Sequence, residues 1–345
     1  MKTQKGIVFL LTLCCCLLFC SLNAEAYGLF FYLFGAEAKV CVTVVDADGK
    51  PVENALTLAT YRQYNWGLVN NVERLTDANG YAELVGRCDY LDADVVVKKE
   101  GCYETRVEKC FKKMGGDINV KWGKWHPYGE HLTCVLKEIR NPVPMVVFWR
   151  VFMHVPEIGK EFGFDLECGD FVKPYGDGEV ADFQLKIEWE EDDRRIVKKA
   201  TMTFPNALDG AYVFPLYRAS KLQSPYHADM DAEYKKEFVF YSVWVKEKPG
   251  RAWHHIVEEE KLTEAQGMIL RTRTKVDANG TLVSAHFSKL YGELATDGFT
   301  PEEASLGGMS TYFNPVENDT NLEYDGKRHR ELQKGKRENT ETEIR

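Results

Sequence analysis

Strand-length apolar runs closed by Asp-containing turns most constrain how this chain can fold. In the run 40–45, alternate residues are valines, which is the period of a strand with one buried face. The turn 46–51 follows, where Gly49 supplies a positive φ and Pro51 ends the ladder. The same order of strand, tight turn and strand returns around the turn 76–80. The pattern predicts a small β-sandwich.

Further short strands continue this pattern. We expect them at 55–61, 81–87, 93–99, 103–109 and 132–137. A meander is one arrangement considered for those at 81–87, 93–99 and 103–109. Such short strands without a helical period favour an all-β Greek-key sandwich.

Three segments carry a family resemblance: VTVVDADGKPVENA (Val42–Ala55), TDANGYAEL (Thr76–Leu84) and VVVKKEGCY (Val95–Tyr103). Together they resemble the carboxypeptidase regulatory-like family, a transthyretin-like or prealbumin-like β-sandwich, over residues 39–138. The chain departs from that family by placing Cys102 after the turn glycine and by a longer insert at 63–73. The resemblance implies a non-catalytic accessory or surface domain, with no active-site residues to transfer and no cofactor.

A length of 345 residues exceeds one ordinary domain. Two prolines in the segment 139–144 interrupt helix and central-strand pairing alike and mark a domain junction. We therefore expect the sandwich at 36–139, a second, mainly antiparallel β-sandwich-like domain at 143–325, and a disordered charged tail at 326–345.

The second domain is again rich in β-branched and aromatic runs. Its predicted strands are 145–155, 183–189, 196–204, 238–246, 268–276 and 281–291. A capping box at Thr300–Glu303 predicts one short helix, and residues 229–237 are a second candidate helix. The segments 163–178 and 310–325 resemble the C-terminal part of exported bacterial proteins that carry the same first domain; this likeness implies no activity.

The N-terminus has the form of a signal peptide. Two lysines precede an apolar run at 7–22 and an Ala-x-Ala site at 23–26, so we expect cleavage of residues 1–26 and a mature chain from Tyr27 that is secreted or periplasmic. An uncleaved anchor and a lipid anchor at Cys20 are the lesser alternatives. The run 29–34 is too short to cross a bilayer, and we expect no transmembrane segment in the mature chain.

Six cysteines remain after such cleavage: Cys41, Cys88, Cys102, Cys110, Cys134 and Cys168. An even number in an exported chain indicates disulfides. In such a meander, Cys88 and Cys110 lie at the same end, so that pair is the best local candidate for a bridge.

Charge limits the class of partner. The net charge of −9 gives no electrostatic attraction to nucleic acid or to anionic membranes. The basic tail is interpreted as a solvated end. Nucleic acid is therefore not expected as a partner, and a protein or a glycan is left as the possible one.

No familiar catalytic, phosphate-binding or metal motif occurs in the sequence. His254 and His255 are adjacent, so on a strand they face opposite sides and cannot share one ion. His126 and His131, the latter beside Glu130, lack a third ligand fixed by spacing. We expect no metal and no cofactor.

Acidic groups have simpler interpretations as turns. Asp46 with Asp48, Asp77 with Asn79 and Asp277 with Asn279 lack the spacing of a calcium loop. The cluster 190–195 is expected to be a solvated hairpin, where carboxyl pKa values stay unsuited to proton transfer.

Aromatic residues give the best ligand candidate. Trp122, Trp125 and Tyr128 lie close together in KWGKWHPYGEH, and their flat rings would stack on sugars or on protein side chains. The alternative is that these rings pack the domain junction.

Three functions follow, in order. The first is an exported β-protein without enzymatic activity that serves in binding, adhesion or cell-envelope architecture. The second is a carbohydrate-binding accessory protein. The third is a hydrolase of unfamiliar design in the second domain, with Asp165, Glu167 and Asp170 as its only candidate acids.

Overall fold

A computed structural model describes residues 35–63, 68–89, 92–111, 120–245, 254–256, 266–292 and 295–327. The expected signal peptide, the start at Tyr27, the alternative anchor at Cys20 and the tail beyond Lys327 lie outside these residues. The chain divides into two compact units between Ile139 and Arg140, and the short segment Ala219–Lys221 belongs to the first unit. Each unit is all-β, as predicted.

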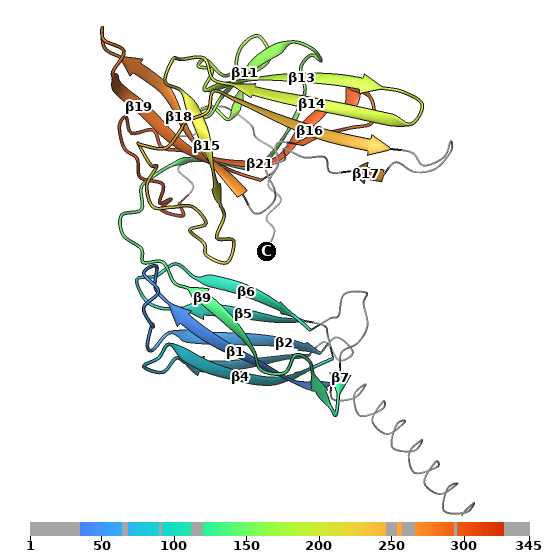
Figure 1. Cartoon of the computed structure of the whole chain (residues 1–345), viewed down its shortest axis with the longest axis vertical. Helices are drawn as coiled ribbons and strands as arrows, with labels where there is room; N and C mark the ends of the chain where they lie inside the picture. Colours follow the sequence, from blue (N-terminus) through green and yellow to red (C-terminus); the bar gives the residue numbers. More distant parts are fainter. Residues whose placement is uncertain are drawn as a thin grey trace, which may run out of the picture. The chain divides into compact units, whose positions relative to one another are not determined.

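The first unit is a sandwich of two sheets (Figure 1). One sheet has the order β4-β1-β8-β7, and β9 also pairs with β1; its strands are β1 (Ala36–Val45), β4 (Tyr81–Cys88), β7 (Val120–Lys121), β8 (Lys124–Trp125) and β9 (Glu130–Val135). The other sheet has the order β3-β2-β5-β6; its strands are β2 (Leu56–Gln63), β3 (Leu68–Leu75), β5 (Asp92–Lys98) and β6 (Thr105–Cys110).

The meander considered for these strands is wrong at its first step. Strand β4 pairs with β1 in one sheet, whereas β5 pairs with β2 and β6 in the other. The connection between β4 and β5 therefore crosses from sheet to sheet. Strand β3 (Leu68–Leu75) begins inside the segment 63–73, which the sequence marked only as an insert, and continues two residues beyond it.

Alternation builds the core of the first unit. Val40, Val42 and Val44 are fully buried between the sheets, together with alternate residues of β2 and β5. The hydroxyl of Tyr61 reaches across and donates to the Leu84 carbonyl at 2.8 Å. Gly86 makes room for the Tyr61 ring, because a Cβ there would lie 2.2 Å from it.

Three tight turns share one geometry. The carboxylates of Asp46, Asp77 and Asp277 each accept two backbone N–H groups of their own turn, at 2.8–2.9 Å. The glycine that completes each turn has a positive φ, between 73° and 81°. These acids therefore serve chain reversal, as the turn interpretation predicts.

The second unit has two six-stranded sheets, with the orders β10-β21-β19-β18-β15, where β20 pairs with β21, and β12-β11-β13-β14-β16-β17. The strands of the first are β10 (Val146–His154), β15 (Gly210–Pro215), β18 (Gln266–Val276), β19 (Leu282–Tyr291), β20 (Ala295–Asp297) and β21 (Ser305–Phe313). Those of the second are β11 (Glu161–Asp165), β12 (Asp170–Phe171), β13 (Phe183–Glu191), β14 (Arg195–Thr203), β16 (Glu237–Val245) and β17 (His254–Ile256). One apolar cluster, including Leu185 and Met202 from one sheet and Met268 and Leu290 from the other, fills the space between them.

The helix predictions need correction. Pro301–Glu303 is a single 3-10 turn, and the Thr300 side chain makes no capping hydrogen bond. Residues 229–237 are not helical. Residues 230–231 form a turn instead, and Lys235 then pairs with Ala211, near the start of β15, through two backbone hydrogen bonds.

None of the six cysteines in the described part of the chain forms a disulfide, so the predicted Cys88–Cys110 bridge is not present there. Cys88 is buried in the core and Cys110 is exposed at the end of β6. The pair was predicted from the meander, and it loses that support because the two strands lie in different sheets.

Candidate functional site

The short hairpin β7–β8 presents one large aromatic side chain to solvent. Trp122 and Gly123 form its turn, and both have positive φ values, 54° and 73°, as a tight hairpin turn requires. Trp122 is 91% exposed. A bulky residue in the left-handed region is an outlier, and such strain is concentrated at functional positions.

Trp125 belongs to the core instead. It is fully buried, lies 5.9 Å from the Phe111 ring in a stacked arrangement, and donates its indole N–H to the Cys88 carbonyl at 2.9 Å. Neighbouring residues of a strand face opposite sides, so Lys124 points outward as Trp125 points inward. Trp125 is therefore a packing residue, but it packs inside the sandwich and not at the domain junction, where the sequence-based alternative placed it.

Tyr128 lies on the outer surface of the β1 sheet. Its hydroxyl donates to Glu37, whose Oε1 also lies 3.5 Å from the Lys124 ammonium. That ammonium is 4.4 Å from the centre of the Tyr128 ring. The hydrogen bond from Tyr128 lowers the pKa of Glu37, and in return Glu37 raises the pKa of Tyr128 to about 12.

A second group of the same composition lies on the same sheet. Glu83 accepts from the Tyr81 hydroxyl at 2.7 Å and pairs with the Lys39 ammonium at 2.7 Å. Lys39 and Tyr81 together lower the pKa of Glu83. The His131 ring lies 5.7 Å from the ring of Tyr81. We name these outward side chains the polar face: Glu37, Lys39, Tyr81, Glu83, Lys124, Tyr128 and His131.

The two groups make the polar face a flat surface of paired donors, acceptors and rings. Trp122 lies two residues before Lys124, at the edge of this surface. The three aromatic residues singled out by sequence therefore differ in accessibility: Trp122 and Tyr128 are accessible to solvent, and Trp125 is not. The contributions of Glu37 and Glu83 were missed because Glu37 lies far in sequence from Tyr128 and Lys124, and Glu83 lies far from Lys39. Only the strand register brings these partners together.

The three acids proposed for a hydrolase make structural contacts. Asp165 accepts backbone N–H groups from 167, 168, 179 and 180, and Asp170 accepts from 171 and 177. Asp165, Glu167 and the fully buried Asp182 all pair with Arg273 at 2.7–3.0 Å. We name these four residues the arginine cluster. Arg273 carried no sequence motif and was missed.

The other candidates stay apart or serve turns. Glu130 pairs with Lys109, and the described residues include no group of three or more His, Cys, Asp or Glu side chains arranged to hold a metal ion. Asp192, in the 190–195 cluster, accepts the backbone N–H groups of 194 and 195 at the tip of the β13–β14 hairpin. The strand β17 contains His254 and His255, whose side chains lie outside the described set. No helix in the described part of the chain has the length and apolarity to span a membrane.

No family model and no curated protein matches the sequence. Among solved structures, the chain is similar to 3-chlorocatechol 1,2-dioxygenase from Rhodococcus opacus 1CP (13% identity, TM-score 0.24), covering 30% of this chain but only 61% of the dioxygenase. It is also similar to a DUF3823 family protein from Parabacteroides merdae ATCC 43184 (7% identity, TM-score 0.21; 73% and 96% covered). A third is a streptococcal ancillary pilin (12% identity, TM-score 0.18; 79% and 58% covered). Likenesses this distant bear on no functional statement about the chain.

Proposed function

We propose that this chain is an exported, non-catalytic binding protein that acts in adhesion or cell-envelope architecture through Trp122 and the polar face. The observation that carries the proposal is the fully presented Trp122, held in a left-handed conformation that costs free energy. An exposed tryptophan has few rotatable bonds, so it supplies a large contact area at low entropic cost, as binding hot spots do. The carboxypeptidase regulatory-like resemblance of the first unit supports the same role.

The absence of catalysis is part of the proposal. The candidate acids Asp165, Glu167 and Asp170 are occupied by Arg273 or by backbone N–H groups. A general acid or base must reach the proton that it transfers. Acids that hold the backbone of their own loop favour a structural role.

A carbohydrate is the second candidate ligand, because the polar face combines flat rings with paired hydrogen-bonding groups. The ring of Tyr128 and the indole of Trp122 offer stacking surfaces, and the carboxylates of Glu37 and Glu83 keep free lone pairs for sugar hydroxyls. Two glutamates beside two lysines leave the surface close to neutral. This balance suits a neutral sugar better than a highly charged one.

The test is a saturation-binding measurement with the labelled chain on isolated bacterial envelope fractions and on a glycan array. Trp122→Ala is expected to weaken binding by about tenfold or more, the loss typical of a hot-spot aromatic. Trp149→Ala is the matched control, because Trp149 is an exposed tryptophan (55%) in the second unit. Equal binding by both variants and the parent would refute the site. Envelope binding with no signal on the array would exclude the carbohydrate alternative alone.

A further inference from the structure

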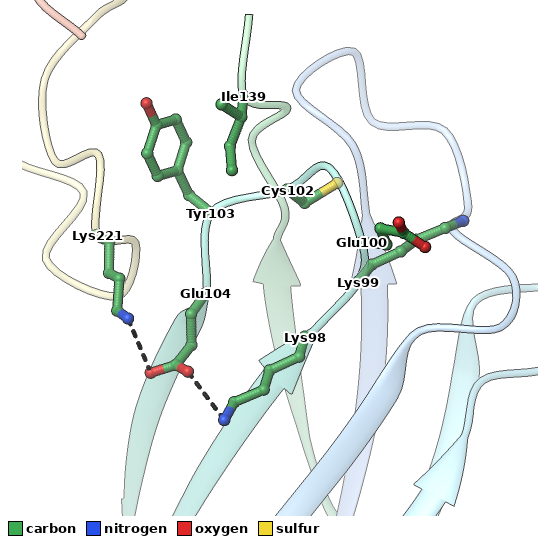
Figure 2. Close-up of a pocket in the computed structure, with 8 residues that line it drawn as sticks. All are labelled: Lys98, Lys99, Glu100, Cys102, Tyr103, Glu104, Ile139 and Lys221. Atoms are coloured by element: carbon green, nitrogen blue, oxygen red, sulfur yellow. Dashed lines mark ion pairs between the residues drawn. The ribbon is translucent and has the colours of Figure 1, made fainter. Parts of the chain in front are cut away.

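A pocket of about 380 Å³ lies in the first unit, at the turn between β5 and β6 (Figure 2). Its lining residues are Lys98, Lys99, Glu100, Cys102, Tyr103, Glu104, Ile139 and Lys221. This volume is in the range of small-molecule sites. The β5–β6 turn and the β7–β8 hairpin are separate parts of the unit, so the pocket is distinct from the polar face.

Lys221 is held at the pocket by backbone bonds. Its N–H donates to the Glu104 carbonyl at 3.0 Å, and the Arg106 N–H donates to the Ala219 carbonyl at 2.6 Å. The segment Ala219–Lys221 thus lies along the start of β6 like a short added strand, with Ser220 paired to Thr105. The backbone position of Lys221 is therefore defined, and its side chain is 68% exposed.

The charges around the pocket do not balance. Figure 2 shows the Glu104 carboxylate between two ammonium groups, 3.1 Å from that of Lys98 and 3.8 Å from that of Lys221. Lys99 turns away and donates to the Glu53 carbonyl at 2.9 Å, with Glu100 on the same side. Two cations share one carboxylate, so one positive charge is left in excess at the Lys98–Lys221 side.

The remaining wall is apolar. The side chains of Tyr103 and Ile139 stand at one side of the pocket in Figure 2, and Ile139 is 45% exposed. Burial, and after it the carboxylate of Glu138, raises the pKa of the Cys102 thiol, so the thiol adds no negative charge at neutral pH; Glu138 lies beside Cys102 and is not among the residues that line the pocket. The pocket therefore combines an excess cation with an apolar surface.

We propose that this pocket binds a small organic carboxylate with an apolar body. The carboxylate lies between the ammonium groups of Lys98 and Lys221, and the apolar body packs against Tyr103 and Ile139. Glu104 competes with the ligand for the same two cations, so it limits affinity. This site is independent of the function proposed for Trp122.

The test uses phenylacetate and its neutral analogue 2-phenylethanol with the whole chain, by chemical-shift titration. The open, partly solvated site predicts a Kd for phenylacetate on the order of 1 mM. Phenylethanol is expected to bind at least about threefold more weakly, because it lacks the charge that pairs with the lysines. Raising the ionic strength is expected to weaken the binding of phenylacetate and to leave the binding of phenylethanol unchanged.

Three variants test whether each charged side chain strengthens or weakens the binding of phenylacetate. Lys98→Met and Lys221→Met are each expected to weaken phenylacetate binding by about threefold, and Glu104→Gln to strengthen it by about threefold. Lys173→Met is the matched control, because Lys173 is an exposed lysine of the second unit with a distant glutamate partner at 3.8 Å. Thermal melting of every variant reports whether it folds.

The outcomes separate this proposal from the earlier one. Equal affinity for the acid and the alcohol in the parent chain would overturn it without any variant. Weaker binding in Glu104→Gln, or unchanged binding in both lysine variants, would also overturn it. Loss of phenylacetate binding in Trp122→Ala would move the ligand to the polar face and refute the pocket.

Discussion

The arginine cluster and the polar face use the same chemistry in opposite surroundings. In the cluster, side-chain exposure is 17% for Arg273 and zero for Asp182; on the polar face it is 47% for Lys124 and 34% for Glu37. A buried charge is stable only while every partner is present. Exposed pairs contribute little to stability. Because their charged groups remain in contact with solvent, a ligand can reach them. Burial therefore separates an internal brace from the surface that we propose to bind a partner.

Position in the fold explains the brace. Arg273 lies in β18, where the pairing with β19 is shifted, and it has a positive φ of 53°. Its guanidinium pairs with residues in and after β11, which belongs to the opposite sheet of the second unit. The bulge aims the side chain inward, and one arginine thereby ties both sheets together.

Removal of the brace is expected to have the largest effect. Arg273→Ala leaves Asp165 and Asp182 buried without their cation, and we expect a loss of about 3–5 kcal/mol in the free energy of unfolding, measured by urea denaturation. Arg194→Ala, at the exposed hairpin turn, is the control and should change stability by less than about 0.5 kcal/mol. Equal effects of the two variants would contradict the comparison.

The two tryptophans of the β7–β8 hairpin should differ nearly as strongly. Trp125→Ala removes a buried ring and its hydrogen bond to Cys88, with an expected loss of about 3–5 kcal/mol in the free energy of unfolding. Trp122→Ala should cost less than about 0.5 kcal/mol. Comparable losses by chemical denaturation would show that Trp122 is a packing residue.

Relief of the strain at Trp122 sharpens this point. Trp122→Gly places a residue without a Cβ in the left-handed turn, and we expect the free energy of unfolding to rise by about 0.5 kcal/mol as ligand binding is lost. The measurement pairs urea denaturation with the envelope-binding assay. A variant that is less stable than the parent would remove the argument from strain.

Acid should weaken the polar face. The pKa of Glu83 is lowered in the folded chain by Lys39 and Tyr81, so its contribution is complete above the unfolded value near 4.3 and is lost as pH falls through the lower folded value. Between pH 6 and pH 3.5, the melting temperature of Glu83→Gln should therefore fall by less than that of the parent chain. An equal fall in the melting temperatures of both proteins would show that the pairing of Glu83 with Lys39 and Tyr81 does not stabilise the fold.

The smallest expected effect is spectroscopic. Glu37→Gln should bring the pKa of Tyr128 from about 12 down toward the ordinary value near 10, because the carboxylate no longer stabilises the protonated phenol. Tyrosinate absorbance during alkaline titration measures this, with Tyr128→Phe subtracted to isolate the one residue. An unchanged difference titration would disprove the hydrogen bond.

The local sequence pattern was enough to predict the all-β fold class. The alternating valines of β1 and the Asp–Gly and Asn–Gly turns specify strands and reversals within a few residues, and all six strands expected in the second unit are present. Pairing was harder to predict, because nothing local tells β4 to join β1 rather than β5. Strands β11, β15 and β21 were missed because they are short, glycine-containing or broken in period.

The site was predictable only in part. An aromatic-rich segment indicated Trp122 and Tyr128, but whether each ring faces inward or outward depends on the register of β8, which also buries Trp125. Glu37 gains its partners only when β1 pairs with β8, and Glu83 gains Lys39 only when β1 pairs with β4. Long-range register therefore sets the chemistry of the face, and sequence alone does not encode it visibly.

The short segment Ala219–Lys221 bears on how this chain can be dissected. Because it lies along β6 although it follows the junction by some distance in sequence, a fragment that stops at Ile139 would leave the Arg106 N–H and the Glu104 carbonyl bare. Uncovered strand edges invite pairing between molecules. We therefore expect a fragment that ends at Ile139 to pair between molecules more readily than the whole chain does, unless Ala219–Lys221 is kept with it.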